Sequence, residues 1–200
     1  TRMDYIYDIE TYPNCFTFAV VDANSGDDPV VYECSPRRND VAQLFDFLDQ
    51  CRRKKDRLVG FNNKDFDYPV VHDLLSVREK AVTVSGKAVA VRAYKKAMSL
   101  IKSEEKFGRA VKPSDEHVKQ VDLFKIHHFD NKAKSTSLKL LEFNMKSDNI
   151  EDLPFPVGTE LTDEQIDVLI HYNKHDVKET RSFYHHSKPM IVFREELSAK

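Results

Sequence analysis

The chain has 200 residues, of which 40% are hydrophobic and 32% are charged, and it carries a formal net charge of −2 at neutral pH. This length and apolar content fit one soluble domain of the α/β class with a core of ordinary size. The slightly acidic balance excludes a freestanding basic protein that binds nucleic acid through its net charge.

The first part of the chain is expected to form an antiparallel meander. Residues 5–9 and 15–21 have the apolar side chains of strands, the second stretch with alternating character. A polar turn at residues 22–27 then sends the chain back into a third strand at residues 30–32. The sequence therefore predicts three strands before the first helix.

Helices and strands are expected to alternate in the rest of the chain. After a cap at Asn39 or Asp40, apolar positions at helical spacing predict a helix that includes residues 41–48. The remaining predicted elements are strands at residues 58–61 and 121–124 and helices at residues 67–77, 88–106, 137–145 and 164–186. A meander followed by this alternation indicates an α/β fold with five strands.

We expect residues 1–200 to form a single domain. Thr1 and Arg2 precede Met3, which we interpret as a native start. Residues 190–198 have the pattern of a new amphipathic helix. Residues 188–200 are therefore expected to begin a linker or a following region.

Cysteine usage and hydropathy favour a reduced cytoplasmic protein. The three cysteines, Cys15, Cys34 and Cys51, have no CxxC spacing and lie in apolar or helical settings, so no disulfide partner is expected. No apolar run approaches the ~20 residues that a membrane helix needs, and no signal peptide precedes the first strand. We therefore expect no membrane partner.

Acidic residues in three short sequence patterns are the candidate metal ligands. Asp8 and Glu10 lie one residue apart on a predicted strand, so both side chains point to the same side and can bind one cation together. Asp67 follows the strand at residues 58–61, and Asp176 lies in the last long helix. Ligands that are all oxygens suit Mg²⁺ or Mn²⁺ rather than zinc. The predicted ligands of a hard divalent cation are therefore Asp8, Glu10, Asp67 and Asp176.

In this order the patterns resemble the three motifs of the DEDD superfamily of 3′-to-5′ exonucleases, in the subclass with tyrosine in the third motif. Asp8-Ile9-Glu10-Thr11 resembles the first motif, residues 60–69 resemble the second, and Tyr172 to Asp176 gives the Tyr-x-x-x-Asp of the third. The resemblance covers roughly residues 4–185. It is closest to the proofreading domain of phage-type DNA polymerases, particularly those of family B.

This resemblance implies a ribonuclease H-like fold, with a central mixed five-stranded sheet flanked by helices. It implies hydrolysis of single-stranded or frayed DNA 3′ ends, with two Mg²⁺ or Mn²⁺ ions as cofactors. A polymerase domain in the same polypeptide would be the partner of such a proofreading domain. The cell would be a bacterium or a phage-infected host.

The resemblance also implies a role for each metal ligand. Asp8 would bridge the two ions. Glu10 and Asp176 would complete the site that activates water. Asp67 would hold the second ion through its waters.

Tyr172 is the residue that would orient the attacking water. It precedes Asp176 by four residues and therefore lies on the same helical face. An unperturbed phenol stays protonated at neutral pH, so Tyr172 suits orientation better than proton abstraction. His175 is a weaker candidate base, since it is turned about 100° away from Asp176 on a helix.

The resemblance further implies which residues bind the single strand. They are Thr11, Asn62 or Asn63, Phe66, Ser137 and Leu138. Stacking of bases on such side chains tolerates any base sequence. Counting back from the Phe-Asp pair selects Asn62 in most of the family and Asn63 in its protein-primed branch, so both asparagines stay candidates.

Residues 78–119 carry an excess of Lys and Arg, including Lys95, Lys96 and Lys102. Two interpretations stay open for this basic segment. It forms a wall beside the acidic site that holds a phosphate backbone, or it is a solvated helix face.

Two further functions also stay open. One is a freestanding RNA exonuclease of the RNase D or oligoribonuclease type, because discrimination of the 2′-hydroxyl depends on pocket geometry. The other is a degenerate exonuclease fold that only binds nucleic acid. The presence of all four acids and of Tyr172 argues against the second.

Overall fold

The computed structural model describes residues 1–102, 111–130 and 153–199. In these residues one sheet contains six strands: β1 (Asp4–Tyr12), β2 (Cys15–Asp22), β3 (Val30–Ser35), β4 (Arg38–Asn39), β5 (Arg57–Gly60) and β6 (Lys119–Asp122). The strand order is β4-β3-β2-β1-β5-β6. Strands β1 to β4 pair antiparallel, whereas β5 pairs parallel with both β1 and β6, so the sheet is mixed.

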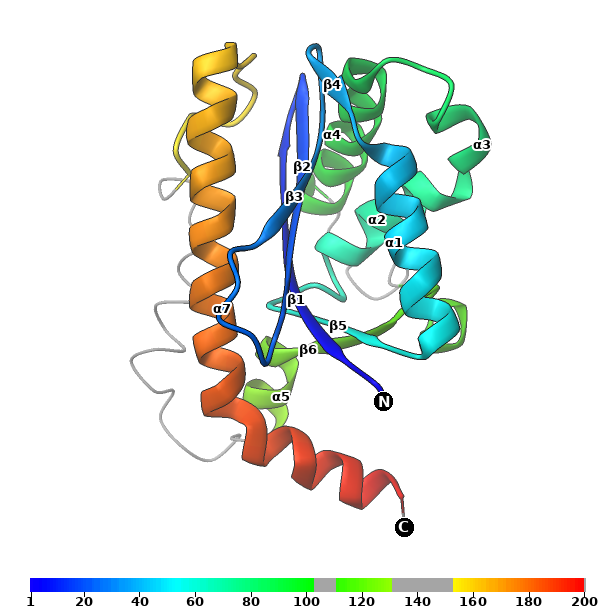
Figure 1. Cartoon of the computed structure of the whole chain (residues 1–200), viewed down its shortest axis with the longest axis vertical. Coiled ribbons are helices and arrows are strands. Elements are labelled where there is room, and N and C mark those ends of the chain that lie inside the picture. Colours follow the sequence, from blue (N-terminus) through cyan, green and yellow to red (C-terminus); the bar gives the residue numbers. More distant parts are fainter. Residues whose placement is uncertain (103–110, 131–152, 200) are drawn as a thin grey trace.

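Helices flank both faces of this sheet (Figure 1). They are α1 (Val41–Lys54), α2 (Asp67–Ser76), α3 (Arg78–Ala81), α4 (Gly86–Lys102), the 3₁₀ turn η1 (Pro113–Asp115), α5 (Leu123–Asp130) and α7 (Asp163–Ser198). Helix α7 runs along one face next to β1 and β2, and α1, α2 and α4 lie on the other side. The described residues therefore form the mixed α/β architecture that the sequence predicted.

The sheet has one strand more than the five we expected. The additional strand is β4, whose two residues pair with Cys34 and Ser35 at the end of β3. Two residues are too few to display the alternation by which a strand is identified in a sequence. The predicted strand count was wrong for this reason.

Strand β6 ends earlier than expected. Leu123 and Phe124, which we placed in a strand at residues 121–124, instead begin helix α5. The Oδ1 atom of Asp122 accepts the backbone N–H of Phe124 at 3.0 Å, as a helix-capping side chain does. A capping side chain therefore starts a short helix that the apolar pattern does not indicate.

Helix α7 is one continuous helix where we expected two. It opens with a capping box, in which Thr162 and Gln165 each accept a backbone N–H from the other. The expected new helix at residues 190–198 was wrong, because α7 continues through Pro189 to Ser198. Proline removes one backbone hydrogen bond, and the last part of α7 changes direction (Figure 1).

The other predicted helices can be compared where the structure describes them. Residues 67–77 correspond to α2, and the helix predicted from residue 41 corresponds to α1. The helix predicted at residues 88–106 begins two residues earlier, at Gly86, and is described as far as Lys102. The helix predicted at residues 137–145 lies outside the described residues.

Alternate side chains of β1 point into different layers. Tyr7 enters the main core, between the sheet and helices α1, α2 and α4. Ile6 and Tyr12 point to the opposite face, where they pack in clusters that include residues of α7. Asp8 and Glu10 have the same parity as Ile6 and Tyr12, so their carboxylates are on the α7 side of the sheet.

A buried ion pair joins β1, β5 and α7. Arg57 donates two hydrogen bonds of 2.8 Å to the Asp4 carboxylate, and Tyr184 donates a third of 2.6 Å. Arg57 also contacts Glu195, near the end of α7. Burial opposes the charge of Asp4, but the hydrogen bonds from Arg57 and Tyr184 still hold its pKa below the ordinary value.

Arg57→Ala is expected to lower the free energy of unfolding by about 3–5 kcal/mol, because it leaves the Asp4 carboxylate buried without its ionic partner. Urea denaturation followed by circular dichroism measures this change. Arg92→Ala is the matched control, since Arg92 pairs with Asp73 but its side chain is 49% exposed. The control should cost at most about 1 kcal/mol. Equal losses in the two variants would contradict a stabilising role for the buried pair.

The structure also describes the state of the three cysteines and the apolar character of the helices. Cys15, Cys34 and Cys51 are all buried and free. Burial raises the pKa of each thiol to about 12. None of the described helices combines the length and the apolar character needed to cross a membrane.

Candidate metal centre

Three carboxylates from distant parts of the chain meet on the α7 side of β1. One oxygen each of Asp8, Glu10 and Asp176 lie within 4.8 Å of one another. Glu10 is buried, and Asp8 and Asp176 are half-buried. The contact between β1 and α7 therefore brings together three of the four predicted ligands.

The donor set of this carboxylate cluster fits a hard divalent cation. Carboxylates this close repel one another while they are ionised, and a bound cation would remove that repulsion. Ligands that are all oxygens favour Mg²⁺ or Mn²⁺ over metals that prefer nitrogen and sulfur. Within the described residues, this is the one group of three or more acids, histidines or cysteines with such close ligand atoms.

The fourth predicted ligand, Asp67, lies beside the carboxylate cluster. It is the first residue of α2, and its Oδ2 atom accepts the backbone N–H of Ile9 at 3.1 Å. Its carboxyl group also shares a hydrogen bond with that of Asp8. Burial raises the pKa of Asp67 to about 7, and the charge of Asp122 adds to the effect. Asp67 therefore retains a proton in the metal-free protein well above the ordinary range of a carboxyl group.

The raised pKa of Asp67 predicts how the stability of the metal-free protein changes with pH. The folded state holds this proton up to about pH 7, whereas the unfolded state loses it near 3.8. Between these values the folded state binds more protons, so the contribution of Asp67 to stability falls as the pH rises.

Asp67→Asn keeps an acceptor for the Ile9 N–H but carries no charge. It is expected to be more stable than the unaltered protein at about pH 7.5, with a smaller difference at about pH 5. Urea denaturation with EDTA at the two pH values measures this difference. An advantage that does not grow with pH would contradict the raised pKa of Asp67.

Asn173 of α7 contacts Asp8 and was missed in the sequence. Its Nδ2 atom donates to Asp8 Oδ2 at 2.9 Å and to the Asp8 backbone oxygen at 3.3 Å. Its Oδ1 atom accepts the Thr17 hydroxyl at 2.8 Å. A signal was present, because Asn173 lies one turn from both Leu169 and Val177, on the buried stripe of the helix where an apolar residue is expected.

The structure distinguishes the two candidate asparagines of the second motif. Asn63 is fully buried, and its Nδ2 atom donates at 2.9 Å to Gln120 Oε1, which also accepts the Tyr7 hydroxyl. The Oδ1 atom of Asn63 is buried without a hydrogen-bond partner. Asn62 is half-buried at a left-handed φ of 58°, and its backbone N–H donates to Asp122. Asn62 is therefore the more accessible candidate for contact with a nucleic acid.

Of the other predicted nucleic-acid contacts, the described residues include Thr11 and Phe66. Thr11 is half-buried, and its parity on β1 directs it to the face opposite the carboxylates. Phe66 precedes α2 and packs, partly buried, against the main core. Ser137 and Leu138 lie outside the described residues.

Tyr172 and His175 have different surroundings on α7. Tyr172 is half-buried and precedes Asp176 by about one turn, so both lie on the same side of the helix. His175 is exposed, and its Nε2 atom lies 2.9 Å from Glu179 Oε1. The geometry therefore favours Tyr172 over His175 as the group on the side of the carboxylates.

Helix α4, which belongs to the basic segment, lies on the other side of the sheet from the carboxylates. Lys95, Lys96 and Lys102 belong to α4, and α4 and α7 flank opposite faces (Figure 1). Two arginines of the segment form ion pairs on that side, Arg78 with Asp49 and Arg92 with Asp73. This arrangement does not bring these lysines into the carboxylate cluster.

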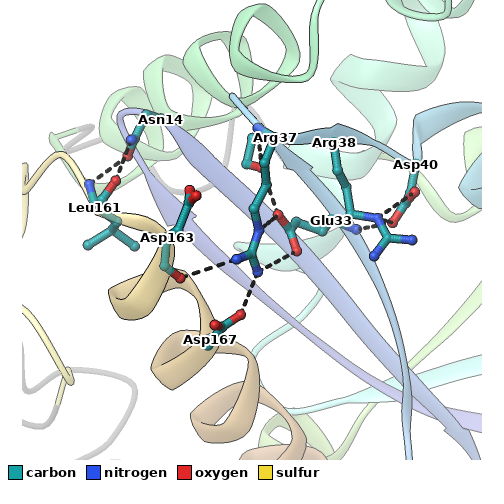
Figure 2. Close-up of polar contacts among 9 residues, drawn as sticks. Asn14, Glu33, Arg37, Arg38, Asp40, Leu161, Asp163 and Asp167 are labelled. Carbon is teal, nitrogen blue, oxygen red and sulfur yellow. Dashed lines mark hydrogen bonds and ion pairs between the residues drawn. The ribbon is translucent and has the colours of Figure 1, made fainter.

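Polar contacts anchor the beginning of α7 to the sheet (Figure 2). Arg37 donates to both carboxylate oxygens of Glu33, at 2.8 and 3.2 Å, and to Asp167 of α7 at 2.7 Å. Asn14, in the turn between β1 and β2, exchanges hydrogen bonds of 2.9 and 2.8 Å with the backbone of Leu161. Since α7 carries one of the three carboxylates, these contacts also help to place the cluster.

Comparisons of the chain with protein-family models, with curated proteins and with solved structures found no match. The position of the carboxylates in the fold, together with the sequence patterns, is therefore the basis on which a function can be proposed.

Proposed function

We propose that the chain is a metal-dependent 3′-to-5′ exonuclease acting on single-stranded or frayed DNA ends, and that it serves as the proofreading domain of a DNA polymerase of the phage-type family B. The observation that carries the proposal is the meeting of Asp8, Glu10 and Asp176 within 4.8 Å. Asp67, from the second motif, hydrogen-bonds to Asp8. Three motifs that are separate in the sequence thus contribute acids to one place.

The arrangement of the sheet supports the same proposal. An antiparallel meander of β1, β2 and β3 is followed by the parallel strands β5 and β6, and α7 packs across β1. This order is compatible with a ribonuclease H-like fold, which is part of the proposal. The pair of acids on β1 and the acid on the last long helix then correspond to the first and third exonuclease motifs.

The proposed mechanism assigns a task to each polar group. Bound Mg²⁺ or Mn²⁺ would supply an activated water and take up charge that develops on the phosphate. Asp8, Glu10 and Asp176 would hold the cation, with Asp67 beside them. Tyr172 would hold the attacking water or a phosphate oxygen through a hydrogen bond from its hydroxyl, and so align it with the scissile bond.

Preference for an unpaired end follows from the need to deliver one terminal phosphate to the carboxylates. A fully paired duplex end must first be unpaired, which costs free energy. This cost is smaller for a mismatched end. Asn62 and Phe66, in the loop that precedes α2, are the described residues proposed to contact the terminal nucleotides. Base stacking on Phe66 would make this contact independent of sequence.

With Mg²⁺ or Mn²⁺, the protein is expected to release mononucleotides from the 3′ end of a single-stranded DNA oligonucleotide, and EDTA should abolish this release. Asp8→Ala combined with Glu10→Ala should lower turnover about 1000-fold or more, because bound metal supplies several kcal/mol of transition-state stabilisation. Gel electrophoresis of a 5′-labelled strand measures the rate. Asp46→Ala with Glu79→Ala removes two exposed acids elsewhere and should leave the rate unchanged. Release that persists in EDTA would contradict the proposal.

The same assay separates the alternatives by substrate. Faster cleavage of a mismatched than of a fully paired 3′ end supports proofreading. Cleavage of RNA but not of DNA would indicate an RNase D or oligoribonuclease type of enzyme. DNA binding without cleavage in either metal would indicate a degenerate binding module.

Tyr172→Phe removes a hydroxyl group but no metal ligand. We expect turnover to fall about 10- to 1000-fold, the range for loss of one positioned hydrogen-bonding group, while the affinity for Mn²⁺ stays the same. Single-turnover cleavage and calorimetric titration with Mn²⁺ measure the two effects. An unchanged turnover would mean that the Tyr172 hydroxyl takes no part in the reaction.

A further inference from the structure

A buried hydrogen-bonded chain runs from β2 through α7 to the carboxylate cluster. Thr17 and Asn173 are both fully buried. The Thr17 hydroxyl donates to Asn173 Oδ1 at 2.8 Å, and Asn173 Nδ2 donates to Asp8 Oδ2 at 2.9 Å. Thr17 also lies directly opposite Glu10 in the pairing of β1 with β2. This series of hydrogen bonds therefore begins at Thr17, beside Glu10, and ends on Asp8.

We propose that Asn173 is a positioning residue, held in orientation by Thr17, that fixes the Asp8 carboxylate in the geometry needed to bind the metal. The inference rests on the proposed function, because it takes Asp8 to be a metal ligand.

The burial of Asn173 indicates that its hydrogen bonds matter to the protein. A buried amide that lacks partners costs free energy, so a helix tends to place apolar residues on its core side. Asn173 occupies such a place, between Leu169 and Val177, and uses both ends of its amide. An apolar residue could fill this place, but it could not donate a hydrogen bond to Asp8.

Thr17 supports the orientation of the amide that the oxygens of Asp8 require, because those oxygens only accept hydrogen bonds. Its hydroxyl donates to the Asn173 oxygen, which leaves the NH₂ group to face Asp8, and the NH₂ group contacts both the carboxylate and the backbone oxygen of Asp8. The energy profile of the last side-chain torsion of a carboxylate is broad, so the torsion itself hinders rotation about that bond only weakly. A donor fixed on Oδ2 restricts this rotation, as outer-shell partners of metal ligands do.

Asn173 also ties α7 to β1 and β2, so a merely structural role has to be separated from positioning. Asn14 provides the matched control. It is a buried asparagine whose amide also ties β1 and β2 to the chain at the start of α7, through Leu161, but within the described residues its side chain hydrogen-bonds to no acid. Loss of either asparagine should reduce stability, whereas only the loss of Asn173 should affect the metal.

The test is direct titration of the intact chain with Mn²⁺ by calorimetry, together with thermal unfolding without metal. Asn173→Ala should bind Mn²⁺ about 10- to 100-fold more weakly than the unaltered protein, the range for loss of an outer-shell partner. Asn14→Ala should bind Mn²⁺ within about twofold of the unaltered protein, although its melting temperature falls. Equal Mn²⁺ affinities for Asn173→Ala and Asn14→Ala would overturn the inference.

Substitutions of Thr17 give a second measurement that decides the matter if Asn173→Ala does not fold. Thr17→Val has nearly the same shape but lacks the hydroxyl, and should weaken Mn²⁺ binding. Thr17→Ser keeps the hydroxyl and should bind Mn²⁺ as tightly as the unaltered protein. Equal affinities for the two Thr17 variants would overturn the inference.

The outcome for the unaltered protein separates this inference from the proposed function. A chain that binds Mn²⁺ but cleaves no nucleic acid would refute the nuclease, while the comparison of variants would still decide the role of Asn173. A chain that binds no Mn²⁺ would refute both.

Discussion

The docking of α7 across β1 and β2 is the contact on which the candidate site depends, because two of the three clustered carboxylates come from the strand and the third from the helix. Polar contacts secure the helix at three levels along its length. Arg37 holds its first turns through Asp167, Asn173 holds its middle, and Tyr184 joins the buried ion pair of Asp4 farther along. A helix held at three places along its length has little freedom to slide or rotate. Such restriction is what a site made from two separate elements requires.

The same docking keeps like charges together, which works against folding. Each acid of the cluster is easier to bury when it is protonated or when a cation is present. The fold accommodates Asp67 with hydrogen bonds from the Ile9 N–H and with Asp8, yet its pKa remains raised. The fold thus holds the carboxylates together against their mutual repulsion. Binding of a cation to the folded state alone would stabilise the fold by mass action.

Local patterns in the sequence were sufficient for most of the fold, whereas the expectation that Asp176 meets Asp8 and Glu10 rested on the three motifs taken together. The alternation on β1 placed Asp8 and Glu10 on one side, and helical spacing placed Tyr172 and Asp176 together. The sequence could not indicate β4, which is too short for a pattern, or α5, which begins at the Asp122 cap. It also could not decide between Asn62 and Asn63, because the burial of Asn63 depends on Gln120 from a distant strand.

The position of the lysines on α4 shows a further limit of sequence-based prediction. An excess of Lys and Arg in a segment is visible in the sequence. The face of the sheet on which these residues lie depends on how their helix packs. Gly86 illustrates the point: a Cβ atom there would lie only 1.9 Å from the Arg38 backbone oxygen, so α4 begins where it packs closely against the first residue of β4. Asn173 was missed for the opposite reason, since its place on a buried stripe was visible but its partners were not.

The three buried thiols provide an internal measure of how the molecule opens. A thiol whose pKa is about 12 is almost entirely protonated at neutral pH, so it reacts slowly with alkylating reagents until it is exposed. Cys15 packs with Ile166 and Leu169 beneath the first turns of α7, whereas Cys51 belongs to the main core on the other face. Alkylation of Cys15 before Cys51 would therefore distinguish detachment of α7 from unfolding of the whole sheet.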